Sequence, residues 1–303
     1  MSFPRRFHIQ AAAVLFWLGL SVELVLAHPG SGIAVDRTGA VYFVDSGSGL
    51  WKIDAAGVIT KIPGAAYHWI ALDAKNAFAR TRLPRERTTD MSAAGSNPTI
   101  LLASDYPIVV APDGNLYYPM AAEGKPLRIM IMTPAGKTSV LGDVPDSKKG
   151  SLRWINGIAA GPDGGLYYTE DNAIWRMTSK GKASIVATIQ TPAGATLVPL
   201  HTKDMGPMLR GLAVDSKGVI YVAATADGRV LKVTPDGKVE TILQVQSPWS
   251  PTAVAVHNGD VYVQEYLHTT GDDRREWLPR VRKITRDGKS TMIATVDKMH
   301  GAR

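Results

Sequence analysis

Residues 209–243 read LRGLAVDSKGVIYVAATADGRVLKVTPDGKVETIL, and this stretch decides the fold. It predicts four short strands, at 212–214, 219–223, 230–233 and 239–243, because side chains alternate with the period of two that marks a β-strand. Each of the three intervening turns contains a glycine, which supplies the positive φ that tight hairpins need. A lone four-stranded meander cannot bury its apolar faces. The stretch therefore requires neighbouring sheets.

The same pattern recurs along the chain. The glycine of the first turn returns in five copies, at Gly39, Gly114, Gly164, Gly218 and Gly259. The long interval between the first two leaves room for one more, degenerate copy. The copies occupy residues 31–62, 68–79 (the degenerate one, with outer strands expected before Ser104), 106–142, 156–189 and 209–243, and a last copy is split between 252–266 and 279–296.

Four-stranded units that repeat about every 44 residues predict a β-propeller, in which radially packed sheets cover each other's faces. With the degenerate copy, the sequence predicts an all-β fold, a six-bladed propeller of four-stranded antiparallel blades. The pattern begins with an inner strand near Gly30 and ends with an outer strand near Val296. We therefore expect the ring to close by packing of the first blade on the sixth, without strand exchange.

The first 27 residues differ in kind from the rest. Arg5 and Arg6 precede an apolar run at 9–20, and small residues follow up to Ala27, which is typical of a secretory signal peptide cleaved after that residue. The sequence thus predicts a removed segment, 1–27, and one propeller domain, 28–303. No other run is long and apolar enough for a membrane anchor.

The amino-acid composition indicates where the protein is located and which kinds of partner it binds. The chain has no cysteine, which suits a protein exported to the bacterial periplasm or the medium with a core large enough to need no disulfides. The net charge is +7, but basic and acidic residues are mixed and no basic stripe appears, so nucleic-acid binding is not expected. We expect a monomer whose partner is a protein or a small molecule.

The recurring consensus, GIAVD-x-x-G-x-VY-V followed by a strand of the type R-(I/V)-x-K-(I/V), resembles the NHL repeat. It is equally similar to the wider group of SMP-30/gluconolactonase-like six-bladed propellers, and the resemblance covers residues 30–297. Such propellers include lactone hydrolases, lyases, sensor domains and scaffold modules. The resemblance therefore implies the fold and leaves the function open.

Loop lengths distinguish the two faces of the predicted propeller. The turns between first and second strands, and between third and fourth, are short in every clear copy. All four long insertions fall between second and third strands or between blades, at 119–126, 142–155, 191–208 and 266–279. We call this side the long-loop face and the other the tight-turn face. Variable loops on a rigid scaffold are the usual place for binding, so we assign the working surface to the long-loop face.

On that face, the positions that begin the innermost strands should line a central funnel. The candidate ligand-binding residues there are Ser31, His68, Tyr106, Asn156, Arg210 and Thr252. The second strands end nearby at Asp45, Glu170 and Glu265, which with Asn156 could hold Ca²⁺ or another divalent cation through oxygen ligands. His68 is the candidate base of a catalytic site. Alternatively, these polar groups only hydrate the channel.

The resemblance to the gluconolactonase-like enzymes bears on the metal. It implies a divalent cation held by a Glu before the first inner strand, an Asn in an N-G-(I/L) motif and an Asp in a later D-G motif. Asn156-Gly157-Ile158 matches the second, but Ser31 and Arg210 stand at the other two positions. Arg210 could bind an anionic group together with His68 and Tyr106. An ion pair of Arg210 with Glu170 or Glu265 is the alternative, and we favour it.

Two hypotheses follow. The first is an exported, non-catalytic NHL-type propeller that binds a partner protein or small ligand on its long-loop face; no cofactor follows from the sequence with certainty, and Ca²⁺ or another divalent cation stays open. The alternative is a divalent-metal-dependent lactone hydrolase of the gluconolactonase type, or a related propeller enzyme. Metal binding through Asn156 would separate them.

Overall fold

The computed structural model describes residues 31–64, 67–81, 98–121, 126–145, 155–197, 207–267 and 278–296. The expected signal peptide, 1–27, lies outside these residues. No helix in this part of the chain is long and apolar enough to cross a membrane.

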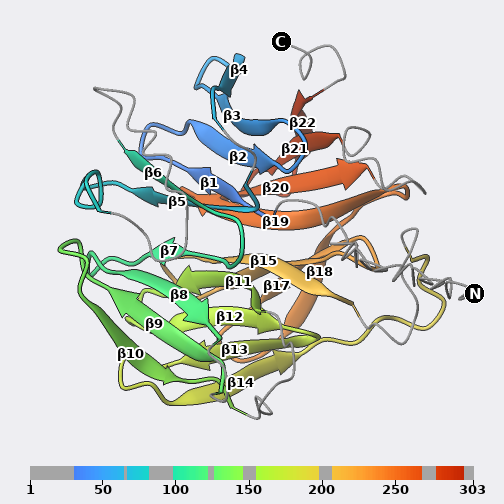
Figure 1. Cartoon of the computed structure of the whole chain (residues 1–303). Helices are drawn as coiled ribbons and strands as arrows, with labels where there is room; N and C mark the ends of the chain where they lie inside the picture. The colour runs from blue at the N-terminus through green and yellow to red at the C-terminus, as the bar shows by residue number, and fades with distance from the viewer. Residues whose placement is uncertain are drawn as a thin grey trace, which may run out of the picture.

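The described residues form antiparallel sheets arranged around a common centre (Figure 1). Five sheets have four strands, joined in sequence order, as the repeat predicts. Their strands are β1 Ile33–Val35, β2 Val41–Asp45, β3 Gly49–Ile53 and β4 Ile59–Ile62; β7 Val109–Val110, β8 Leu116–Met120, β9 Arg128–Met132 and β10 Thr138–Asp143; β11 Ile155–Ala160, β12 Leu166–Glu170, β13 Ala173–Met177 and β14 Ala183–Thr188; β15 Leu209–Val214, β16 Ile220–Ala224, β17 Arg229–Val233 and β18 Val239–Gln244; and β19 Trp249–His257, β20 Asp260–Leu267, β21 Pro279–Ile284 and β22 Ser290–Thr295.

The degenerate copy departs from this plan. It forms a two-stranded sheet, in which β5 (Trp69–Asp73) pairs with β6 (Thr99–Ala103). The described residues that follow β5, 74–81, make turns and not a second strand, because Phe78 is buried and its N–H donates to Asp73 Oδ2 at 2.8 Å. The chain therefore leaves β5 at Asp73 and enters β6 at Thr99, both at the tight-turn end of the sheet. The prediction that every long insertion lies on the long-loop face is wrong for this sheet.

The innermost strands β1, β5, β7, β11, β15 and β19 are neighbours in that order, and β1 also lies beside β19. The first and last sheets share one apolar cluster, which joins Phe43 and Trp51 to Tyr262, Val281 and Val296. The ring thus closes by packing of one sheet on the other. Each of the two sheets consists of its own consecutive strands, as the sequence predicts.

Glycines let the innermost strands approach closely. A Cβ added to Gly211 would lie 2.8 Å from Ala253 Cα, and one added to Gly157 would lie 2.7 Å from the Arg210 carbonyl oxygen. Both contacts are with backbone of the next inner strand, so neither could relax by a side-chain rotation. The spacing of the ring at its centre therefore depends on the recurring x-Gly-(Ile/Leu) step.

Candidate functional site

Buried polar groups gather at one end of the sheets. In the described part of the chain, those at the tight-turn end are Asp36, Asp73 and Thr99. Those at the long-loop end are Ser31, Asp45, Ser46, Thr169, Glu170, Arg210, Thr225, Asp227, Ser250, Thr252, Gln264 and Glu265. Burying a polar group costs free energy unless it is hydrogen-bonded. A ring with a purely structural role would therefore gain no stability from gathering so many buried polar side chains at one end.

The central channel is nearly closed just below that face. Trp69 is 5% exposed, and its indole Nε1 donates to the Asn156 carbonyl oxygen at 3.3 Å, which joins β5 to β11. A cavity there measures about 50 Å³ and is lined by Trp69 and by residues in or directly before the inner strands, including Gly32, Gly157 and Gly211. That volume holds water and not an organic ligand, which needs roughly 300 Å³ or more.

Four of the six predicted funnel residues are linked around this constriction. The Ser31 N–H donates to the His68 carbonyl oxygen at 2.8 Å, and Arg210 Nη1 donates to Ser31 Oγ at 3.4 Å. Asn156 joins them through Trp69, whose ring meets that of His68 edge to face at 5.5 Å.

The other two funnel residues are placed differently. Tyr106 stacks on Tyr118, with ring centroids 5.3 Å apart. Thr252 is fully buried at the start of the last sheet. The anion site of Arg210, His68 and Tyr106 that the sequence suggested therefore stays a prediction.

His68 has a defined tautomer. Its Nδ1 lies 2.8 Å from the Ser104 carbonyl oxygen, which can only accept, so Nδ1 carries the proton. The ring is partly buried between β5 and the segment that follows β6. His68 thus has its Nδ1 committed to the fold.

Arg210 is the strongest charge near the constriction. It is 9% exposed, and burial lowers the pKa of its guanidinium to about 10, with the Tyr266 hydroxyl opposing that shift. The group therefore stays cationic at neutral pH. Its own carbonyl oxygen accepts from Thr169 Oγ1 at 2.8 Å, which ties β15 to β12. Arg210 is held in place by both its backbone and its side chain.

The predicted metal ligands are not brought together. Both oxygens of Glu265 are bound by arginines, with Arg280 Nε and Arg282 Nε each at 2.6 Å, so the expected pairing of Glu265 with Arg210 is not formed. Asp45 accepts from Ser48 Oγ and from the Tyr266 hydroxyl, and burial raises the pKa of its carboxyl.

Glu170 is 1% exposed, at the end of β12. Within the described residues, no group of three or more His, Cys, Asp or Glu side chains gathers as a metal site would require. With Arg210 at the third position of the family's pattern, the donor set does not fit a divalent cation, which a nearby guanidinium repels.

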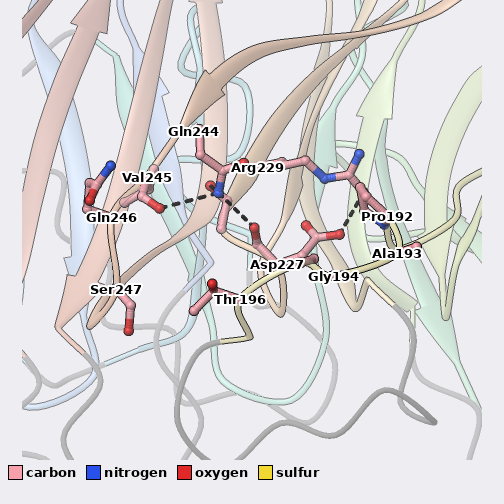
Figure 2. Close-up of a pocket in the computed structure, with 12 residues that line it drawn as sticks. Pro192, Ala193, Gly194, Thr196, Asp227, Arg229, Gln244, Val245, Gln246 and Ser247 are labelled. Carbon is pink, nitrogen blue, oxygen red and sulfur yellow. Dashed lines mark hydrogen bonds and ion pairs between the residues drawn. The ribbon is translucent and has the colours of Figure 1, made fainter.

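Sequence reasoning missed a pocket on the long-loop face, between the sheets β11–β14 and β15–β18 (Figure 2). We call it the inter-sheet pocket. It has a volume of about 410 Å³, and three connections line it: 192–196 after β14, the turn at Asp227 and Gly228, and 244–247 after β18. The only signal in the sequence is the pair of charges around Gly228. It gives no hint of burial, because the other two walls come from distant segments.

The closed ring of antiparallel sheets around a narrow channel defines a β-propeller. The family model described as SMP-30/Gluconolactonase/LRE-like region matches residues 29–267. The chain belongs to this family, which confirms the resemblance found in the repeat.

Solved structures share the fold at low sequence identity. Virginiamycin B lyase from Staphylococcus aureus aligns with a TM-score of 0.51 and 18% identity, over 90% of this chain and 86% of that one. A luciferin-regenerating enzyme aligns with a TM-score of 0.53 and 16% identity, over 85% of this chain and 91% of that one. A putative gluconolactonase aligns with a TM-score of 0.51 and 17% identity, over 90% of this chain and 92% of that one. At these identities the likeness concerns the fold alone.

One curated relative matches in sequence. Teneurin-3 from Mus musculus is 29% identical over 267 residues, which is 80% of this chain. The chain spans 9% of the length of that relative. The match therefore concerns one segment of a much larger protein.

Proposed function

We propose that this protein is a non-catalytic propeller that binds a partner protein or a small ligand on its long-loop face. The observation that carries the proposal is the concentration of buried polar and charged side chains at that end of the sheets, from Asp45 to Glu265. Buried groups of this kind cost stability unless they are paired and hydrogen-bonded, and functional sites are where proteins commonly keep them. The long connections on the same face supply variable surface around them.

The metal-dependent hydrolase is the less supported alternative. Of the three ligand positions that the family pattern implies, only Asn156 is retained, and Arg210 and Ser31 are hydrogen-bonded to each other at 3.4 Å at the other two. A guanidinium there only donates hydrogen bonds and repels a cation, which disfavours capture of a metal ion.

The test compares metal binding and hydrolysis directly. The wild-type chain and Asn156→Ala are melted with and without Ca²⁺ or Zn²⁺, and both are assayed with gluconolactone. We expect neither cation to raise the melting temperature and no hydrolysis above the buffer rate. A metal-dependent rise that Asn156→Ala abolishes, or hydrolysis that it abolishes, would overturn the non-catalytic proposal.

A gain of metal binding gives a second readout. Ser31→Glu combined with Arg210→Asp restores the carboxylates of the family pattern around Asn156. We expect this double variant to bind Ca²⁺ measurably by calorimetry while the wild-type chain does not, because a carboxylate pair replaces a cation. Equal Ca²⁺ affinity of the two chains would contradict our explanation of the wild-type site.

Three finer statements belong to the same proposal. We infer a six-bladed ring in which β5 and β6 are the reduced second blade. We also infer export as a monomer after cleavage behind Ala27, on the strength of the N-terminal pattern. Amino-terminal sequencing of the protein from a periplasmic or medium fraction, with light scattering of the same sample, tests export and state; a start at Met1 would refute the cleavage.

A further inference from the structure

The turn that joins β19 to β20 contains one of the two Asn-Gly pairs of the sequence, Asn258-Gly259; the other pair is Asn156-Gly157. Both residues of the turn have a positive φ, 52° for Asn258 and 82° for Gly259, as in a two-residue hairpin of type I′. Both are exposed, at the tight-turn end of the last sheet. The turn is therefore open to water and lies on the face opposite the proposed binding surface.

An asparagine that precedes a glycine can react with its own backbone. The glycine nitrogen loses its proton and attacks the side-chain carbon Cγ, so a bond from that nitrogen to Cγ forms and the bond from Cγ to Nδ2 breaks. The departing nitrogen gains a proton and leaves as ammonia. Water then opens the resulting succinimide ring to aspartate or to isoaspartate. Glycine favours the attack because it has no Cβ beside the attacking nitrogen.

The backbone of the Asn258-Gly259 turn fits this reaction. The Gly259 N–H donates no hydrogen bond to the described part of the chain, so the attacking nitrogen has no such bond to break first. Left-handed backbone is disfavoured for a residue with a side chain, so rotation of Asn258 towards the extended form is not opposed by its own preference. Only the closing pair of the hairpin, His257 with Asp260, has to open.

The leaving nitrogen has a proton donor beside it. Asn258 Nδ2 lies 2.9 Å from Nε2 of His257, whose side chain is partly exposed. In the amide, Nδ2 donates this hydrogen bond. After the attack the same nitrogen has to accept a proton before ammonia departs, and an imidazole that has taken up a proton can supply it.

The other Asn-Gly pair is held inside the ring. Asn156 and Gly157 belong to β11, and a Cβ added to Gly157 would lie 2.7 Å from the Arg210 carbonyl oxygen of β15. The Asn156 carbonyl oxygen also accepts from Trp69 Nε1 at 3.3 Å. Rotation of this backbone would separate β11 from β15 and break the contact with β5. The fold therefore opposes the attack at Asn156.

We propose that Asn258 is a modification site, at which the folded protein converts asparagine to aspartate and isoaspartate while Asn156 is preserved. The reaction consumes one water and releases one ammonia. Arg286 Nη2 donates to the Asn258 carbonyl oxygen and joins this turn to the β21–β22 turn. Isoaspartate adds a methylene to the backbone here, so the two turns lose that contact as the protein ages.

The test is incubation of the full chain at neutral pH, followed by digestion and mass spectrometry of the peptides that contain Asn258 and Asn156. In the folded protein we expect Asn258 to convert at least tenfold faster than Asn156. In urea the two rates should become similar, because the fold no longer distinguishes them. Equal rates in the folded protein, no conversion of Asn258, or a difference of the same size in urea would overturn the proposal.

Two variants locate the chemistry. Asn258→Gln lengthens the side chain, so attack would have to form a larger and less favoured ring, and the acidic species that ion exchange separates from aged wild type should be absent. Its persistence would place the reaction elsewhere. His257→Gln removes the proton donor and should slow conversion of Asn258 at least threefold; an unchanged rate would refute the role of His257. These results do not depend on the proposed binding function, so the two proposals fail separately.

Discussion

The two ends of the sheets use the same kinds of residue in opposite ways. At the tight-turn end, aspartates receive backbone hydrogen bonds: Asp215 Oδ1 accepts from the N–H groups of Lys217 and Val219 at 2.8 and 2.9 Å, and Asp36 repeats the arrangement with Thr38 and Ala40. At the long-loop end, each buried carboxylate has a different set of partners. Repetition marks the end that builds the fold, and variation marks the end available for function.

The pKa shifts follow this division. Burial raises the pKa of Asp36, but hydrogen bonds from Thr38, Ala40 and Tyr42 outweigh it, and the net shift is downward. Burial also raises the pKa of Asp45, and there the bonds from Ser48, Gly47 and Tyr266 do not compensate, so the net shift is upward. The ionised form is thus stabilised at one end of the first sheet and penalised at the other.

The largest expected effect is at Glu265, which is fully buried between two arginines. Glu265→Gln leaves Arg280 and Arg282 without their counter-charge, and we expect a loss of about 3 kcal/mol in the free energy of unfolding. Asp163→Asn is the matched change at the tight-turn end. There the side chains of Asp163 and Arg176 are 38% and 31% exposed, and an asparagine oxygen can still accept the Gly165 N–H, so the loss should stay below about 1 kcal/mol. Urea unfolding of both variants measures the difference; equal losses would show that the two ends do not differ in this respect.

The next effect concerns the spacing of the inner strands. Gly211→Ala places a Cβ 2.8 Å from backbone of β19 and should cost about 1–3 kcal/mol. Gly165→Ala is the control near the tight-turn end, where the nearest atoms are side-chain atoms, Arg176 Nε at 3.1 Å and Asp163 Oδ1 at 3.2 Å. These side chains can shift by a few tenths of an ångström, so the change should remain within about 1 kcal/mol. A Gly211→Ala protein with wild-type stability would contradict the close packing of β15 on β19.

The smallest effect is a difference in pH dependence. Because the folded-state pKa of Asp45 is raised, its ionisation removes stability as the pH rises from the usual value to the raised one, and Asp45→Asn should abolish that loss. Asp36 has the opposite sign: its ionised form contributes stability above the usual pKa, and this is lost as the pH falls through the lowered folded-state value.

Melting temperatures from about pH 3 to pH 8 test both signs. Asp45→Asn should become relatively more stable than wild type with rising pH, and Asp36→Asn relatively less stable. If the melting temperatures of both variants, relative to wild type, change in the same direction as the pH rises, the opposite signs of the Asp45 and Asp36 pKa shifts are refuted.

The sequence predicted the repeating parts well because their determinants are local. A glycine such as Gly218, with a φ of 78°, and an aspartate three residues before it specify a turn without help from the rest of the chain. Five four-stranded sheets and the absence of strand exchange followed from that pattern. The degenerate copy was harder, since β6 pairs with β5 across an insertion that carries no strand alternation.

The sequence by itself therefore determined the family, the repeated sheets and the tight turns. Only the tertiary structure decided which charges meet. Arg210 reaches Ser31, 179 positions away, and Arg229 reaches the Gln190 carbonyl oxygen of the neighbouring sheet. Turns are set by φ preferences and hydrogen bonds over four residues, whereas the long-loop face is assembled by packing separate sheets around a ring. Its partners have no fixed spacing along the chain, so no local pattern could predict them.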